Sequence, residues 1–334
     1  MKKIIIPIII LIVLAAVAVP LYTYLAPVTV EKTEIDVPSD SNSTKIGTLL
    51  KENNLIRSEF AFKVHLKISG DGSELKAGKY TFKGKYSMGD ITAQLKKGGE
   101  AKGIKLTIPE GYNLKQISDV LAKDGLCTKD EFNLAVANGD YPYDYLPAKG
   151  DPNRLQGFLY PETYIFDEGT SAETIIAAML KEFNSQFTSE YKAQLQKDGR
   201  TVLQWLTMAS IVEKEAVVKD DRPIIAGVFY NRLAKNMLLQ SCATVQYALG
   251  EVKTVLSNQD VQIDSPYNTY KNQGLPPGPI ASPGHASLEA AMYPAQTEYL
   301  FFVAKHNGAH VFTKTYEEHL AAKTAIKNGE YDNQ

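Results

Sequence analysis

The stretch LQWLTMASIVEKEA, at Leu203–Ala216, is the most apolar run after the N-terminus, and it ends abruptly in charged residues. It contains no Gly or Pro and is long enough for a helix, which the pattern therefore predicts. Apolar residues fall on every side, as in a buried helix. Helical spacing places Glu213 on a mostly apolar face, where a carboxyl is costly to ionise, so this residue is a candidate general acid. The alternative is that Glu213, Lys214 and Glu215 simply mark where the helix reaches solvent.

The composition is that of a globular protein with ordinary charged and apolar fractions. A chain of 334 residues is long enough for two or more domains with their own cores. The net charge of -2 gives no overall attraction to nucleic acid, and we expect none as a partner. Cys127 and Cys242 match no zinc or redox spacing. We expect them to be buried free thiols, with a disulfide between them as the alternative.

The N-terminus carries an uncharged apolar run, Ile4–Leu25, after Met1-Lys2-Lys3. This run is long enough to cross a bilayer, and its apolar core is longer than that of a cleaved secretory signal. Acidic residues such as Glu31 follow it. The positive-inside rule then places the N-terminus in the cytoplasm and the remaining chain outside. Residues 1–25 are therefore predicted to be a cytoplasmic tip and a single-pass transmembrane anchor in the cell membrane.

Two segments of the chain repeat at an offset of 71 residues. One begins at Val37-Pro38 and the other at Ile108-Pro109, and each then predicts a short strand, a turn, a helix and a loop. The expected N-cap is Ser43 or Thr44 in the first segment and Asn113 in the second. We therefore expect an α+β protein with a linker at 26–35, a small strand–helix module at 36–104 and a larger catalytic domain at 105–334.

The segment 63–105 is rich in lysine and poor in acidic residues. Such a face could meet anionic lipid or an anionic wall polymer, and a solvated face is an equally good interpretation. Further on, Tyr267–Pro283 predicts a long rigid loop rich in Gly and Pro, of a kind that is often functional. Tyr299–Ala304 and His310–Thr313 are expected to form a hairpin around an Asn-Gly turn.

The sequence carries no Gly-rich phosphate loop, no HExxH motif and no nucleophile-elbow context. His306 and His310 are four residues apart, but the hairpin turn between them removes the helical spacing of a ligand pair. We therefore expect no metal site and no cofactor. What remains is acid chemistry by carboxylates.

Three separated motifs, in this order, resemble the YceG-like family of endolytic murein transglycosylases. They are LQGFLYPETYIF at 155–166, ASIVEKEA at 209–216 and YNTYKNQGLPPGPIASPG at 267–284. The resemblance covers nearly the whole chain and implies a LysM-like module before the catalytic domain. It also implies cleavage of the MurNAc–GlcNAc bond inside nascent peptidoglycan strands, which leaves 1,6-anhydro-MurNAc ends. Peptidoglycan synthases (penicillin-binding proteins) are the implied protein partners.

By this resemblance Glu213 is the catalytic residue, acting first as general acid and then as base on the C6 hydroxyl. A second carboxylate is then not required, unlike in the usual glycosidase pair. The candidate substrate-binding residues are Tyr160, Glu162, Gln240, Asn268, Thr269 and Tyr270. Where many family members have an Asp-Pro pair, this chain has Ser241-Cys242.

Two other readings stay open. A hydrolytic glycosidase would use Glu162 or Glu215 as the base that activates water. A non-catalytic scaffold would need only the LysM-like module to bind the cell wall.

Overall fold

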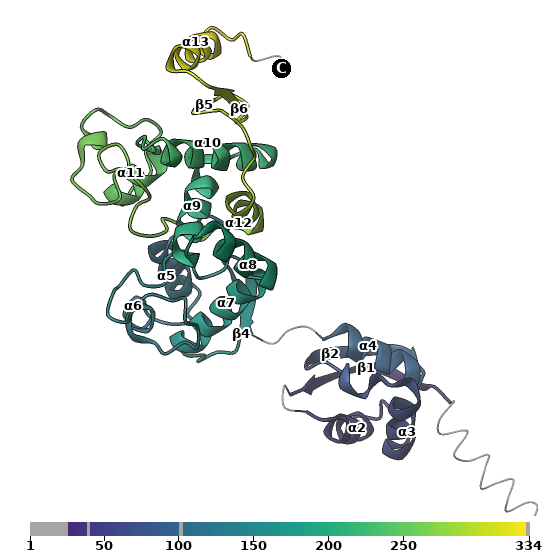
Figure 1. Cartoon of the computed structure of the whole chain (residues 1–334). Coiled ribbons are helices and arrows are strands. Elements are labelled where there is room, and N and C mark those ends of the chain that lie inside the picture. Colours follow the sequence, from purple (N-terminus) through teal and green to yellow (C-terminus); the bar gives the residue numbers. More distant parts are fainter. Residues whose placement is uncertain (1–25, 39–40, 100–102, 332–334) are drawn as a thin grey trace, which may run out of the picture. The chain divides into compact units, whose positions relative to one another are not determined.

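The computed structural model describes residues 26–38, 41–99 and 103–331, and it divides into two compact units, Met1–Gly103 and Ile104–Gln334 (Figure 1). Both units combine helices with small two-stranded antiparallel sheets, which confirms the α+β class. The predicted span Ile4–Leu25 lies outside the described residues. Among the residues that are described, no helix is both long and apolar enough to cross a membrane.

The first unit is a two-stranded sheet covered by helices. Its elements are β1 (Val28–Val37), α2 (Ser43–Glu52), α3 (Glu59–Ser69), a 3₁₀ turn (Asp71–Ser73), β2 (Gly78–Tyr86) and α4 (Met88–Lys97). The strands pair antiparallel, with Ile35 opposite Tyr80. Leu50, Phe62 and Phe82 are fully buried in its core. The unit therefore has a hydrophobic core of its own.

The linker predicted at 26–35 is wrong, because most of it belongs to β1. Val30, Ile35 and Val37 point into the core, as expected for alternate residues of a strand. The register shifts between Val30 and Thr33, so an irregularity interrupts the alternation of apolar and polar residues. Because of that interruption and the charged residues around it, the sequence pattern did not predict a strand here.

The second unit is mainly helical. It contains, in order, β3 (Ile104–Thr107), α5 (Leu114–Lys123), α6 (Lys129–Asn138), β4 (Thr163–Phe166), α7 (Ala172–Gln186), α8 (Ser189–Asp198), α9 (Val202–Glu215), a 3₁₀ turn (Lys219–Asp221), α10 (Arg222–Ala234), α11 (Cys242–Leu249), a 3₁₀ turn (Asp260–Gln262), α12 (His285–Met292), β5 (Phe301–Ala304), β6 (His310–Thr313) and α13 (Tyr316–Lys327). Figure 1 shows β5, β6 and α13 at the end of this unit opposite α6.

The repeat predicted from the sequence is present as two copies of a strand–helix–helix–strand arrangement. The first copy is β1–α2–α3–β2 and the second copy is β3–α5–α6–β4; the outer strands of each pair antiparallel. Helices α2 and α5 have the same length and lie 71 residues apart. The N-cap prediction is confirmed for Asn113, but in the first copy the cap is Asn42 rather than Ser43 or Thr44.

Helix α9 is the predicted buried helix, and it lies at the centre of the second unit. Every residue from Trp205 to Val212 is buried. The Trp205 indole donates to the carbonyl of Leu288 and packs against Phe187 and Tyr191. Helices α10 and α12 both pack against α9. Because α9 is held on several sides, the residues at its C-terminal end have a fixed position.

The hairpin of β5 and β6 is confirmed. Cys127 and Cys242 are both free, as expected, but neither is fully buried: Cys127 is half-buried and Cys242 is exposed.

Candidate active site

Glu213 lies in the last turn of α9, and its side chain is only 8% exposed. Its Oε2 accepts a hydrogen bond of 3.0 Å from the backbone N–H of Gly284, the N-cap of α12. Its Oε1 lies 3.7 Å from Nη2 of Arg222, whose Nε donates to Ser287 Oγ. An N–H donor and a guanidinium both stabilise a carboxylate, so Glu213 is held in one place and can carry charge there.

The three sequence motifs meet around α9, through contacts between residues that are distant in the chain. The backbone N–H of Ile280 donates to the buried Oγ of Ser210, which ties the long loop to α9. Gly157 packs against Pro279, where a Cβ would come within 2.5 Å of the proline ring. The loop predicted at Tyr267–Pro283 therefore has its path fixed against both of the other motifs.

A second carboxyl, that of Glu110, lies beside Glu213, and the sequence reasoning missed it. Glu110 follows β3 in the turn before α5. A Cβ added to Gly284 would fall 1.8 Å from Oε1 of Glu110, so this carboxyl contacts the same glycine that donates to Glu213. The pKa of Glu110 is raised, first by partial burial of the carboxyl and then by the negative charge of Glu213. Two acids thus share one site.

Tyr160 is buried and close to this site. Its pKa is raised to about 12, mainly by burial, and the nearby charge of Glu110 adds to the shift. Glu162 is exposed, and its carboxylate accepts from the backbone N–H of Thr163, while its carbonyl accepts from Ile108. Glu213 accepts a hydrogen bond from Gly284 and forms an ion pair with Arg222, and Glu162 contributes to neither interaction.

The other four predicted substrate-binding residues lie around the start of α11. Asn268 and Thr269 are almost fully buried. Asn268 donates to two carbonyls of its own loop, and Thr269 binds the backbone N–H of Ser241. We therefore assign these two residues to the support of the loop rather than to substrate contact. Tyr270 is partly exposed and Gln240 is exposed, with φ of 51° and its N–H bonded to the Thr269 carbonyl.

Glu215, the competitor of Glu213, serves a different part of the structure. Its Oε1 accepts from Ser241 Oγ and from the backbone N–H of Ala243, at the start of α11. Burial raises the pKa of Glu215. Cys242 Sγ pairs with the Tyr270 hydroxyl at 3.1 Å. The Ser-Cys sequence that departs from the family pattern therefore belongs to a hydrogen-bonded junction between α9, α11 and the long loop.

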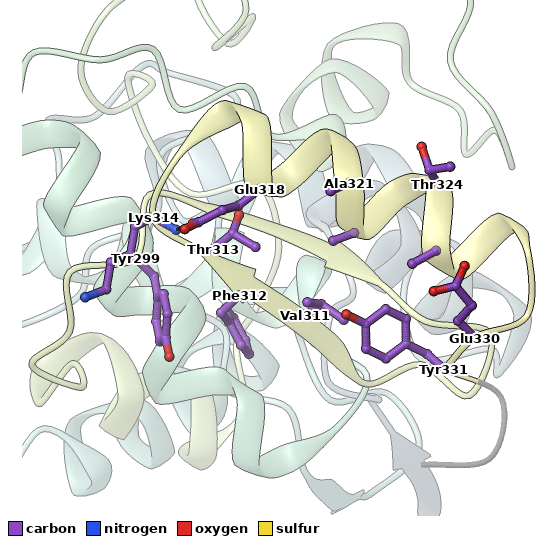
Figure 2. Close-up of a pocket in the computed structure, with 12 residues that line it drawn as sticks. Tyr299, Val311, Phe312, Thr313, Lys314, Glu318, Ala321, Thr324, Glu330 and Tyr331 are labelled. Atoms are coloured by element: carbon purple, nitrogen blue, oxygen red, sulfur yellow. Dashed lines mark hydrogen bonds between the residues drawn. The ribbon is translucent and has the colours of Figure 1, made fainter.

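A pocket of about 280 Å³ opens at the C-terminal end of α9. Its lining includes Gly111, Lys214, Glu215 and Cys242, whereas the side chains of Glu110 and Glu213 lie next to these residues and do not line it. A larger pocket of about 800 Å³ lies elsewhere, between β6 and α13, and Figure 2 shows its lining side chains, such as Phe312 and Tyr331. That larger pocket contains none of the predicted site residues. We take the smaller pocket as the candidate cleft because Gly111 and Lys214, the chain neighbours of Glu110 and Glu213, line it.

Comparison with known proteins agrees with the resemblance noted in the sequence. The model of the YceG-like family matches residues 35–325, and the chain therefore belongs to this family. An endolytic murein transglycosylase of Bacillus subtilis is 42% identical over 301 residues, which cover 86% of this chain and 83% of that protein.

A protein of the same name from Streptococcus pneumoniae is 36% identical over 85% of this chain, and the match spans 56% of the pneumococcal protein. Among solved structures, a crystal structure of a YceG-like protein of Listeria monocytogenes has 38% identity and a TM-score of 0.61, covering 87% of this chain and 98% of that one.

Proposed function

We propose that this chain is a membrane-anchored endolytic murein transglycosylase that cuts the MurNAc–GlcNAc bond inside peptidoglycan strands and leaves 1,6-anhydro-MurNAc ends. The observation that carries the proposal is the position of Glu213. Its carboxyl is mostly buried at the end of α9, fixed by Gly284 and Arg222, where the three family motifs meet. The names of the curated relatives support the same reaction.

The reaction needs one proton donor and then one proton acceptor. Glu213 protonates the glycosidic oxygen, and the bond from that oxygen to C1 of MurNAc breaks. The resulting Glu213 carboxylate then takes the proton of the C6 hydroxyl as this oxygen bonds to C1. The Arg222 guanidinium and the Gly284 N–H stabilise that carboxylate. The proton removed from C6 restores the starting acid, and no water is consumed.

The anchor and the partners extend this proposal. The uncharged run at 4–25 holds the chain in the cell membrane with the N-terminus in the cytoplasm, and peptidoglycan synthases supply the nascent strands. Protease treatment of intact protoplasts tests the orientation. Loss of the catalytic domain under this treatment is expected, and its complete protection would contradict an extracytoplasmic position.

Mass spectrometry of the products on uncrosslinked glycan tests the reaction. Wild type should leave anhydro ends, which are lighter by one water than the reducing ends that a hydrolase would leave. Glu213→Gln should lower the rate by about a hundred- to ten-thousand-fold, the usual contribution of a general acid or base. Glu168→Gln, at an exposed turn of the same unit, is the matched control. Reducing ends would support the hydrolytic glycosidase, and a wild type that never cleaves would support the scaffold.

A further inference from the structure

Glu110 is held beside the catalytic candidate by contacts with two other segments. The N–H of Gly111 donates to the Ser282 carbonyl at 2.8 Å, and the N–H of Ser282 donates to the Tyr112 carbonyl at 2.7 Å. Nζ of Lys214 donates to the Gly111 carbonyl at 3.3 Å. The turn after β3 is thus fixed both to the segment before α12 and to the end of α9. The position of Glu110 follows from this backbone pairing.

The carboxyls of Glu110 and Glu213 both contact Gly284, in different ways. Gly284 donates its N–H to Glu213, and its missing Cβ leaves the space that the Glu110 carboxyl fills. Their other surroundings differ. Glu213 has the amide donor and the nearby guanidinium of Arg222. The carboxyl of Glu110 has no hydrogen bond or ion pair with any residue in the described part of the chain.

This arrangement bears on a difficulty in the proposed mechanism. A general acid must start with a proton, yet the Gly284 N–H and the Arg222 guanidinium beside Glu213 are both groups that attract negative charge. A second carboxyl at the same glycine has the opposite effect, because two like charges at short range are costly and a proton relieves the cost.

We propose that Glu110 is a positioning residue for the catalytic proton: the carboxyls of Glu110 and Glu213 hold one proton between them, which Glu213 delivers to the glycosidic oxygen. This proposal rests on the proposed function and adds a second residue to it. The pair carries one proton before cleavage, loses it to the leaving oxygen and regains it from the C6 hydroxyl. Glu110 forms no bond to the sugar.

The charges around the pair are consistent with this role. From α10, Arg222 lies near both carboxyls, and from α12, His285 lies near Glu110. From α9, Lys214 is held at the Gly111 carbonyl, and Tyr160 is also near Glu110. The cations lower the cost of a negative charge. The raised pKa of Glu110 shows that burial and the charge of Glu213 together outweigh them.

The pH dependence of kcat/KM on uncrosslinked glycan, measured with the full-length chain, tests the proposal. Activity needs the shared proton. The activity is therefore present at low pH and is lost at high pH, along the alkaline limb of the profile, as the pair loses this proton. Glu110→Gln removes the like charge, and the limb should move down by about one pH unit, with about tenfold less activity above it and near-normal activity well below it. Glu110→Asp keeps the charge, so its alkaline limb should lie close to that of wild type.

Glu110→Ser gives a second variant in case the Gln variant does not fold, and it should shift the limb in the same direction. Glu168→Gln, which removes a charge from an exposed turn, should leave the limb unmoved. An equal loss of activity at every pH in the Glu110 variants, or a limb that moves up, overturns the role of Glu110 and leaves the function intact. A wild type that leaves no anhydro ends overturns both.

Discussion

The strand–helix–helix–strand repeat occurs twice, and the two copies differ at the turn before their first helix. In the second copy this turn carries Glu110-Gly111, beside Glu213. At the same offset the first copy has Ser39-Asp40, which lie outside the described residues. The two copies share buried leucines at equivalent positions, Leu50 and Leu121. The helical frame is therefore common to both, whereas the acid that faces the candidate site belongs to one.

The copies also differ in how their second helix connects to their last strand. In the first copy, residues 70–77 make a short connection that includes a 3₁₀ turn. In the second copy, residues 139–162 separate α6 from β4, and this longer connection contains Gly157, which packs against Pro279 of the long loop. The second copy thus contributes a turn and an insertion to the site. The fold of the second copy determines where those two segments lie, and Glu110 in the turn provides the acid beside Glu213.

Truncation of the equivalent core leucines should give the largest difference in effect between the two copies. Leu50→Ala and Leu121→Ala each remove a fully buried side chain and should cost about 2–5 kcal/mol of unfolding free energy. Each unit has its own core, so Leu121→Ala should lower the melting temperature of the second unit and its activity together. Leu50→Ala should lower only the transition of the first unit.

Calorimetry and cleavage assays on uncrosslinked glycan measure these two effects. If Leu50→Ala reduced cleavage in proportion to Leu121→Ala while both proteins stayed folded, the first copy would take part in catalysis, and the contrast between the copies would be lost.

Gly284→Ala should have the next largest effect, because it acts on the feature that the first copy lacks. The added methyl would overlap the Glu110 carboxyl, which ends a flexible side chain and can swing away. The backbone of Gly284 has φ of -78°, which alanine adopts without strain, so the fold should persist. We expect the alkaline limb of kcat/KM to fall by up to about one pH unit, or tenfold in activity above it.

The measurement is the same pH profile, with circular dichroism as the check on folding. Combining Gly284→Ala with Glu110→Gln gives a double-mutant cycle. If the methyl acts only by displacing Glu110, the second change should add little to the first. Additive effects would mean that the alanine disturbs Glu213 directly.

The parts of the fold that follow local rules could be predicted from the sequence. The apolar spacing at 203–216 indicated α9, the offset of 71 residues indicated α2 and α5, and Asn-Gly indicated the hairpin of β5 and β6. Each of these depends on residues close together in the chain. Strand β1 was missed because its irregular register broke the alternation that a strand pattern requires.

The candidate site could be predicted only in part, because its contacts join distant residues. Glu213 was found through its place on an apolar helix and through a motif. Arg222 gave no local signal, since its position beside Glu213 comes from the packing of α10 against α9. One signal was present for Glu110: an acid followed by glycine, where the sequence of the first copy has Ser39-Asp40 at the same offset.

Helix capping should give the smallest difference between the copies. Asn42 caps α2 by accepting from the N–H groups of Thr44 and Lys45, and it is exposed. Asn113 caps α5 within a capping box, in which Gln116 donates its N–H to the asparagine side chain and its own side chain accepts from the Asn113 N–H. Alanine at either position should cost about 1 kcal/mol of stability.

Loss of the two caps should nevertheless have different effects on cleavage activity. Asn113 lines the pocket at the end of α9 and lies three residues after Glu110, so fraying of the first turn of α5 would loosen the turn that carries this acid. We expect Asn113→Ala to lower kcat/KM by a few-fold and Asn42→Ala to leave it within error, at matched losses of stability in urea unfolding. Because the two asparagines hold equivalent positions, equal activity in the two variants would mean that the position of Glu110 depends on its pairing with Ser282 and Lys214 and not on the cap.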